Sequence, residues 1–367
     1  MSKMDHTPIV SVVMPVYNAA EYLGEAVDSI LGQTFGDFEF IIINDGSTDG
    51  SGEILDRYQQ SDDRVRVIHQ ENSGVAATLK RGLESARGKY VARMDSDDIS
   101  LPNRLEKQVA FMESHPEVGV CGTACRLFGD SSGVTMPKTE SEEIKSWLLF
   151  GPCMAHPTVI MRRDLIVKHN LYYNMEFKQA EDYELWIRFS QYCEMANIPE
   201  PLLLYRVRDK QATTEFRSEV CRWSGLVHKM AIGSLGIEPT DEELDLHLSF
   251  HSASFPKSRE YVEQFEKWLR KLLEANNNNK VRDGKAFARV LFECWRCLFA
   301  GEVELGVWMW KRFTRSELFR AQANTRFAPT VSSALFFCRA SVSSVLEKTR
   351  TGRSFKRFAR AIANNGW

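Results

Sequence analysis

Four short, largely apolar runs constrain the fold of this chain most strongly, because each is followed by a polar turn and then by a segment with helical spacing. The runs are residues 9–14, 38–43, 65–68 and 90–94. Such runs are typical of strands that are buried on both faces of a parallel sheet. Strands that alternate with helices are joined by right-handed crossovers, so the pattern predicts a doubly wound, mostly parallel α/β sheet.

Polar residues follow three of these strands, at the carboxyl edge where open α/β sheets bind their ligands. Pro15 and Tyr17 follow the first run, Asp45 follows the second, and residues 95–98 (DSDD) follow the fourth. Because neighbouring parallel strands end at the same edge, we expect these groups to meet there. The convergence predicts one ligand site made from three separate segments.

The DSDD segment carries three carboxylates within four residues, which is unfavourable unless a cation neutralises them. We expect Asp95 and Asp97 to face a divalent metal that also holds an anionic group. Oxygen ligands favour Mg²⁺ or Mn²⁺, and a Mg²⁺ held by few carboxylates shares its shell with substrate phosphates. An acidic turn that only faces water is the alternative for this segment taken alone.

The length and composition are those of an ordinary globular protein with two domains. We expect residues 1–7 to be disordered, residues 8–213 to form the α/β domain and residues 214–367 to form a mainly helical domain. The formal net charge of -2 gives no reason to expect nucleic acid as a partner. We expect a cytoplasmic location, because residues 1–7 lack the apolar core of a signal peptide and no apolar run reaches the roughly 18 residues of a membrane span.

The second domain shows helical spacing of large apolar residues in four segments. These are residues 219–234, 261–274, 285–313 and 333–346. Four consecutive asparagines, residues 276–279, interrupt the pattern and predict a surface loop.

The C-terminal part is basic, with twelve Lys and Arg residues but two Glu between Trp308 and Arg360. Four apolar residues near its end fall on one helical face: Phe355, Phe358, Ala359 and Ile362. Two interpretations of this basic amphipathic tail stay open. It binds an anionic membrane surface, or it docks on its own domain with a solvated charged face.

Between about Pro8 and Gln211 the chain also carries five ordered motifs. They are residues 12–18 (VVMPVYN), 44–49 (NDGSTD), 95–98 (DSDD), 102–105 (PNRL) and 181–186 (EDYELW). In these motifs and their spacing the chain resembles glycosyltransferase family 2, the inverting nucleotide-sugar enzymes with the GT-A fold. The resemblance implies a GT-A catalytic domain that binds the nucleotide sugar, followed by the helical domain.

The resemblance places the donor at the strand ends. It implies that Pro15, Tyr17 and Asp45 hold the nucleoside, with uridine as the expected base. Asp95-Ser96-Asp97 matches the family's DXD motif, which implies contacts to the ribose, the metal and the diphosphate, with Asp97 as the stronger metal ligand. Two alternatives stay open, namely Tyr17 as a core aromatic residue and Asp45 as only a helix-start cap.

On the acceptor side, Asp182 matches the family's general base, and Glu181 and His156 are expected beside the acceptor. A plain helix N-cap is the alternative for Asp182. Residues 156–161 are predicted to form a strand, so a structural strand residue is the alternative for His156. A helix N-terminus lowers the pKa of Asp182, whereas the neighbouring Glu181 and Glu184 raise it, and the balance stays open at this point.

Two positions depart from the family pattern. Tyr205-Arg206-Val207-Arg208 places an arginine where the family often has a histidine that approaches the metal or the diphosphate. Arg208 does not ligate a metal, but its guanidinium suits a phosphate. Lys80 stands where many relatives have asparagine, and we expect it either at the diphosphate or as a solvated helix lysine.

The predicted activity is the metal-dependent, inverting transfer of a hexose or N-acetylhexosamine from a nucleotide diphosphate sugar to a saccharide hydroxyl. By family analogy and tail composition, we expect a role in bacterial surface polysaccharide or lipopolysaccharide assembly, with a lipid-linked acceptor and peripheral attachment at the inner face of the plasma membrane. A nucleotidyltransferase is disfavoured because residues 14–20 lack a glycine-rich basic loop. A catalytically silent nucleotide-sugar-binding scaffold is disfavoured because binding alone needs no base such as Asp182.

Overall fold

The structure, a computed structural model, describes residues 6–208, 217–252, 256, 258–301 and 305–320. The chain forms two compact units, residues 1–144 with 152–227 and residues 145–151 with 228–367. Residues 1–5, the helix expected at residues 333–346 and the basic tail lie outside the described residues.

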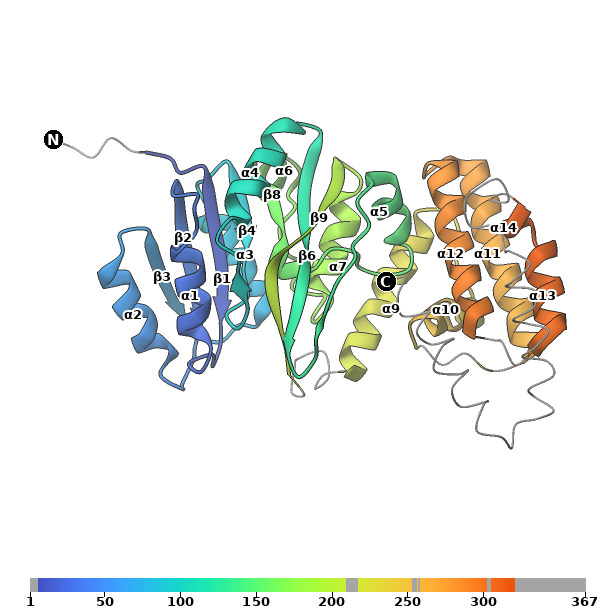
Figure 1. The fold of residues 1–367 in the computed structure, drawn as a ribbon, viewed down its shortest axis with the longest axis horizontal. Helices are drawn as coiled ribbons and strands as arrows, with labels where there is room; N and C mark the ends of the chain where they lie inside the picture. The colour runs from blue at the N-terminus through green and yellow to red at the C-terminus, as the bar shows by residue number, and fades with distance from the viewer. Residues whose placement is uncertain (1–5, 209–216, 253–255, 257, 302–304, 321–367) are drawn as a thin grey trace. The chain divides into compact units, whose positions relative to one another are not determined.

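In the described part of the first unit, nine strands form one mixed sheet with the order β3-β2-β1-β4-β8-β6-β9-β5, and β7 pairs with β6 (Figure 1). The strands are β1 (Val10–Val16), β2 (Phe38–Asp45), β3 (Val65–Gln70), β4 (Tyr90–Arg93), β5 (Ile99–Ser100), β6 (Val118–Gly129), β7 (Gly133–Val134), β8 (Ile160–Arg162) and β9 (Glu194–Val207). Strands β3, β2, β1 and β4 pair in parallel, as do β6 and β9, whereas β8 runs antiparallel between β4 and β6. The expected α/β sheet is confirmed, with antiparallel strands added to its parallel half.

Helices cover both faces of the parallel half, as continuous apolar strand runs require. The helices of the first unit are α1 (Leu23–Leu31), α2 (Ser51–Ser61), α3 (Val75–Ser85), α4 (Arg104–Ser114), α6 (Arg163–His169) and α7 (Glu181–Phe189), while α5 (Ser141–Trp147) and α9 (Arg217–Gly233) contain the points where the two units divide. Val12 of β1 shares one buried core with Leu55 of α2 and Leu105 of α4. On the opposite face α3 packs so closely that a Cβ added to Gly82 would meet Val13 Cγ1 at 2.3 Å.

The segment at residues 156–161 differs from its expected strand. His156–Thr158 form a 3₁₀ helix, and β8 begins only at Ile160. Pro157 has no N–H for a strand ladder, and its fixed φ suits a helical turn. Because Val159 O accepts a hydrogen bond from Arg93 N–H at 2.9 Å, this turn lies beside the last residue of β4.

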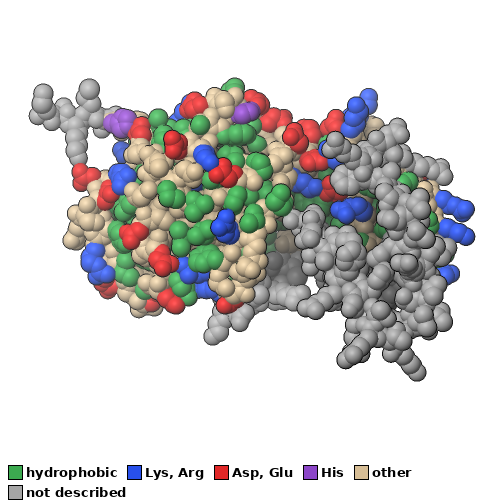
Figure 2. Space-filling view, in the orientation of Figure 1, with side chains coloured by type: hydrophobic (Ala, Val, Ile, Leu, Met, Phe, Trp, Pro, Cys, Tyr) green, Lys and Arg blue, Asp and Glu red, His purple; other side chains and the backbone are tan. Residues whose placement is uncertain are grey.

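Charged side chains of both signs are interspersed over the described residues on the face shown in Figure 2, with apolar side chains between them. This mixture agrees with a formal net charge of -2. Among the helices of the described ranges, none has the combination of length and apolar character that a membrane-spanning helix needs.

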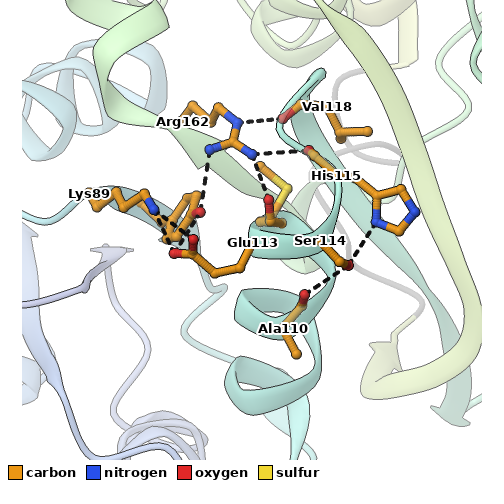
Figure 3. A network of polar contacts seen from close by, with 9 residues as sticks. Lys89, Ala110, Glu113, Ser114, His115, Val118 and Arg162 are labelled. Atoms are coloured by element: carbon orange, nitrogen blue, oxygen red, sulfur yellow. Dashed lines mark hydrogen bonds and ion pairs between the residues drawn. The ribbon is translucent and has the colours of Figure 1, made fainter.

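Arg162, at the end of β8, connects the far ends of several elements (Figure 3). Its guanidinium donates to Val118 O at 2.7 Å, to Met112 O at 2.6 Å and to His115 O at 3.0 Å. The last two carbonyl groups belong to the end of α4, where a helix leaves carbonyls without partners of its own. The same guanidinium lies 5.4 Å from the ring centroid of Tyr90, at the start of β4. Arg162 therefore fixes the end of the sheet opposite to the expected ligand edge.

The described residues of the second unit are mainly helical. The helices are α10 (Asp241–Leu248), α11 (Arg259–Asn279), α12 (Gly284–Gly301), α13 (Gly306–Arg315) and α14 (Glu317–Arg320), with a 3₁₀ helix at Ser249–Ser252. Phe292, Trp295 and Phe299 of α12 pack against Phe313 of α13 with ring centroids 4.1–6.2 Å apart. The helices expected within the described residues are confirmed, although the one expected at residues 285–313 is divided between α12 and α13.

The four asparagines belong to the last turn of α11, so the surface loop expected there was wrong. Asn276 is 1% exposed, and its side chain accepts from Arg282 N–H at 2.8 Å and donates to Arg282 O at 3.2 Å. Asn279 donates to Leu235 O at 2.7 Å. Lys280, with a φ of 52°, then ends the helix. Residues of modest helix propensity are tolerated here because their amides satisfy backbone groups at the helix end.

Candidate active site

The expected convergence at the carboxyl edge of the sheet is present in the structure. Strands β2, β1 and β4 are neighbours, so the residues at their ends meet along one edge. Pro15 is the penultimate residue of β1 and pairs with Ile43 of β2. Tyr17, directly after β1, is 56% exposed, which excludes a core aromatic residue.

The loops after β1 and β2 are joined by hydrogen bonds. Asn18 N–H donates to Ser47 Oγ at 3.0 Å, and Asn18 Oδ1 accepts from Thr48 N–H at 2.8 Å. Asn18 has a φ of 49°, a region that asparagine enters more readily than most residues. Asp49 Oδ2 accepts from Ala20 N–H at 2.9 Å. These hydrogen bonds fix the loop after β1 against the loop after β2.

Asp45 ends β2 with a carboxylate that is nearly inaccessible to solvent. Its oxygens accept from the Gln70 amide at 2.7 Å, from Ser73 N–H at 2.9 Å and from Gly74 N–H at 3.0 Å. Gly74 is the N-cap of α3, so Asp45 holds the start of α3 beside the end of β2. The structure thus gives Asp45 a capping task, on α3 rather than on the helix that follows β2. Its contact with a nucleoside stays a prediction.

Lys80 and Ser96 were also expected at the donor. Lys80 lies on α3 with its side chain 37% exposed and its Nζ 4.0 Å from Glu84 Oε1. Ser96 is half-buried in the turn that follows β4. The position of Lys80 is compatible with a solvated helix lysine, and the donor contacts of both residues stay predictions.

Asp95, Asp97 and Asp98 form the acidic turn, in which one carboxylate oxygen from each residue lies within 4.8 Å of those of the other two. Arg93, at the end of β4, forms a bidentate ion pair with Asp95. Arg208, just after β9, donates from Nη2 to Asp97 Oδ2 at 2.6 Å. Two of the three acids are therefore paired with arginines from the edge of the sheet.

Arg206, on β9, holds the acidic turn in place. Its backbone N–H donates to Asp98 Oδ1 at 2.8 Å, and its Nε donates to Asp97 O at 2.7 Å. Its guanidinium carbon lies 4.3 Å from the ring centroid of Tyr22 and 4.4 Å from that of Phe128. This side chain received no role from the sequence motifs, because its contacts come from segments more than 70 residues away.

The donor set of the acidic turn fits a hard divalent cation. Asp98 is 1% exposed, and its Oδ2 has no hydrogen-bond partner in the described part of the chain. Burial and the charge of Asp95 raise the pKa of Asp98 to about 8, and the same causes raise the pKa of Asp97. Because a bound cation would relieve this repulsion and occupy the orphaned oxygen, Mg²⁺ or Mn²⁺ suits these three carboxylates.

Glu181 and Asp182, the acid pair, begin α7. The N-cap residue is Ala180, which forms no side-chain cap, so Asp182 is not the N-cap of this helix. Asp182 Oδ1 accepts from Tyr183 N–H at 2.6 Å, which lowers its pKa, but burial is the larger effect and the pKa is raised. Burial and the charge of Asp182 raise the pKa of Glu181 to about 7. Glu181 Oε2 is buried without a hydrogen-bond partner among the described residues.

His156, which is half-buried, and Tyr173, which is buried, form a neutral pair. His156 Nε2 lies 2.7 Å from the Tyr173 hydroxyl oxygen, and the imidazole ring packs edge-on against Trp186 of α7. Burial holds the pKa of His156 well below its usual range and raises the pKa of Tyr173. Both rings are therefore uncharged at neutral pH, and His156 lies in a turn rather than in a strand.

The charge of Arg93 interacts with both the acidic turn and the acid pair. Its charge lowers the pKa values of His156, Glu181 and Asp182, while the charge of Asp95 raises those of Glu181 and Asp182. Such interactions require proximity, so the structure brings both acid clusters into the neighbourhood of one buried arginine. The signal that the sequence-based assignment missed is a charged residue inside an otherwise apolar strand. The arrangement suits group transfer from an anionic donor to a hydroxyl group.

Residues 11–169 match the family model described as glycosyl transferase family 2. The chain is similar to an uncharacterized glycosyltransferase from Haemophilus influenzae, with 33% identity over 229 residues that cover 59% of this chain and 71% of that protein. It is also similar to the O-antigen biosynthesis glycosyltransferase WbnJ from Escherichia coli, with 35% identity over 211 residues that cover 55% of this chain and 81% of WbnJ.

Among solved structures, the fold is similar to that of TarS residues 1–349 from S. aureus, crystallised in complex with UDP-GlcNAc. The TM-score is 0.54 at 20% sequence identity, and the match covers 81% of this chain and 91% of that chain. This likeness supports the α/β GT-A fold.

Proposed function

The chain belongs to glycosyltransferase family 2, and we propose that it is an inverting enzyme that transfers a hexose or N-acetylhexosamine from a uridine diphosphate sugar to a saccharide hydroxyl. The observation that carries this proposal is that Arg93 pairs with Asp95 of the acidic turn, while its charge also lowers the pKa values of the acid pair. The acidic turn provides a place for a cation and a diphosphate, and the acid pair provides a base.

On the donor side, we assign the nucleoside to Pro15, Tyr17 and Asp45. The support is their common position at the carboxyl edge and the exposed ring of Tyr17. Asp97 and Asp95 would hold Mg²⁺ or Mn²⁺, which supplies Lewis-acid stabilisation of the leaving diphosphate when bound. Ser96, Lys80 and Arg208 complete the proposed contacts to the ribose and the phosphates.

On the acceptor side, Asp182 takes the proton of the acceptor hydroxyl. The acceptor oxygen then forms a bond to the anomeric carbon, and the bond from that carbon to the diphosphate oxygen breaks with its electron pair left on the diphosphate. Attack from the side opposite to the leaving group inverts the anomeric centre. Burial supports the role of Asp182, because a carboxylate with a raised pKa is a stronger base. Glu181 and the neutral His156 are proposed to orient the acceptor by hydrogen bonds.

The biological setting proposed is the assembly of a bacterial surface polysaccharide or lipopolysaccharide from lipid-linked acceptors on the cytoplasmic side of the membrane. The similarity to an O-antigen biosynthesis enzyme supports it. The basic tail, which would attach the enzyme to the membrane, lies outside the described residues, so its role stays a prediction.

The test compares Asp182→Asn with Asp164→Asn in a UDP-release assay over a panel of uridine diphosphate sugars with Mn²⁺ and saccharide acceptors. Asp164 is a matched control, because it is the exposed second residue of α6 and its Oδ1 also accepts the N–H of the next residue, at 2.9 Å. We expect Asp182→Asn to lower kcat by at least about a hundredfold with little change in UDP affinity, since only proton transfer is removed. Asp164→Asn should keep wild-type kcat.

Full activity of Asp182→Asn would exclude Asp182 as the base. The anomeric configuration of the product, measured by NMR, tests the stereochemistry separately, and a retained configuration would contradict inversion.

A further inference from the structure

Arg208 is bound to the acid expected to be the stronger metal ligand. Its Nη2 donates to Asp97 Oδ2 at 2.6 Å, and the side chains are 39% and 22% exposed respectively. Its guanidinium carbon lies 5.0 Å from the ring centroid of Tyr22. Its Nε is buried and has no hydrogen-bond partner among the residues that the structure describes. Arg208 therefore retains donor capacity beyond its ion pair with Asp97.

The other arginines at this edge have further structural contacts. Arg93 is 6% exposed and forms a bidentate pair with Asp95. Arg206 binds Asp97 O and Glu25 and lies between two aromatic rings. Moving Arg93 would break a bidentate pair in the core, and moving Arg206 would break several contacts, whereas moving the partly exposed Arg208 breaks its ion pair with Asp97 and its ring contact with Tyr22. Arg208 is thus the arginine of the acidic turn that can change partners at the lowest cost.

A divalent cation and Arg208 compete for Asp97, because they use the same carboxylate and repel each other. A diphosphate, in contrast, attracts an arginine, whose planar fork binds phosphate oxygens in a bidentate manner. Resting on the proposed function, we propose that Arg208 exchanges partners. It neutralises Asp97 in the donor-free enzyme, leaves Asp97 when the metal binds, and then binds the diphosphate of the nucleotide.

This exchange makes metal binding and nucleotide binding cooperative. Metal alone must displace Arg208 from Asp97 without giving it a new partner, so it binds weakly. When nucleotide is present, the displaced guanidinium gains the diphosphate, so each ligand strengthens the other by the same factor.

The experiment measures Mn²⁺ binding to the full chain by electron paramagnetic resonance, first without nucleotide and then with saturating UDP. For the wild type, we expect UDP to lower the Kd of Mn²⁺ by more than about tenfold. Arg208→Gln should bind Mn²⁺ alone roughly tenfold more tightly than the wild type, because Asp97 has lost its competing cation. In this variant UDP should still lower the Kd of Mn²⁺, because the cation also contacts the diphosphate, but by a smaller factor than in the wild type.

Two further variants separate competition from indirect effects. Arg208→Lys keeps the positive charge but not the bidentate fork, so it should bind Mn²⁺ alone as weakly as the wild type and show reduced cooperativity. Lys89→Gln removes one positive charge at the start of β4, where Lys89 pairs with Glu113, and should behave as the wild type. Circular dichroism and thermal unfolding establish that each variant is folded.

An Arg208→Gln variant that binds Mn²⁺ alone with wild-type or lower affinity overturns the exchange. A wild-type protein in which Mn²⁺ and UDP bind independently overturns it as well. The proposed function fails differently, by absence of turnover of every nucleotide sugar in the wild type, and the Mn²⁺ and UDP titrations then still decide whether Arg208 exchanges partners.

Discussion

Glu181, which is buried, and Asp182, which is half-buried, are adjacent carboxyl groups whose raised pKa values predict the pH dependence of transfer. Asp182 must be ionised to act as a base, so log kcat/KM should rise with pH and level off above the raised pKa of Asp182. The charged groups that face the pair are Arg93, which lowers both pKa values, and Asp95, which raises them. Because the charge of Asp182 raises the pKa of Glu181, Glu181 is still protonated while Asp182 ionises, and we expect Glu181→Gln to leave the acidic limb in place.

The control for Glu181→Gln is a variant of Glu176, an exposed carboxyl group five residues earlier in the chain. Glu176→Gln should leave the pH profile unchanged.

The pH dependence of the free energy of unfolding gives a second measurement of the raised pKa of Glu181. The folded state holds the proton of Glu181 more tightly than the unfolded state, so this group lowers stability as pH rises from its unfolded pKa to about 7. Glu181→Gln should remove this loss. An acidic limb that Glu181→Gln moves would show that Glu181 ionises before Asp182, against this order of titration.

The site residues that the sequence predicts are those whose role follows from their position at the end of a strand. Strand ends that carry Tyr17, Asp45 and Asp97 converge because parallel neighbours end together, and that rule needs only the order of the strands. The roles of the arginines could not be predicted from strand order alone. Arg93 forms an ion pair with Asp95, and its charge also lowers the pKa values of the acid pair on α7. Arg206 contacts both the acidic turn and the ring of Phe128, which is far away in the sequence. These roles therefore depend on the three-dimensional fold. The partner of Asp45 also differs from the expected one, because α3 lies nearer to its carboxylate than the sequence order suggests.

At the scale of elements, the end of α4 depends on Arg162 (Figure 3). Arg162→Met would leave carbonyl groups of Met112, His115 and Val118 without their donor, and we expect a loss of about 3 kcal/mol in the free energy of unfolding. Urea denaturation measures this loss. The specific activity of the folded variant should stay near that of the wild type, because Arg162 lies at the opposite end of β4 from the acidic turn.

The control for this variant is Lys89→Met, in the same network. Lys89 forms an exposed pair with Glu113 at 2.6 Å, which predicts a loss of less than about 1 kcal/mol. Equal losses for the two variants would show that the carbonyl contacts of Arg162 are not what stabilises this end of the sheet.

The elements that periodicity predicted well are those whose burial pattern is simple. The parallel strands and the helices that cover them are continuous apolar runs or one-sided helices, and both appear where expected. The turn at Pro157 and the asparagines at the end of α11 were mispredicted for a common reason. Their local composition favours one conformation, while hydrogen bonds to distant groups such as Leu235 O stabilise another.

At the scale of the molecule, all described residues of the proposed site belong to the first unit, from Pro15 to Arg208. A ligand stabilises only states that retain its binding site, so opening of elements at the site becomes rarer, whereas opening of helices elsewhere need not release the ligand. The two units should therefore respond differently to the donor.

Hydrogen exchange with UDP and Mn²⁺ tests this difference along the whole chain. We expect exchange to slow in peptides that cover residues 93–98, 180–184 and 204–208, by up to about a hundredfold at ligand concentrations of about 100 Kd. Peptides from α11 and α12 should exchange as in the ligand-free protein. Asp97→Asn, under the same conditions, should show little slowing, since the cation loses a ligand and the nucleotide loses the cation. Equal slowing in α11 and in the acidic turn would mean that opening of the second unit is coupled to the site, against the expectation drawn from the placement of its residues.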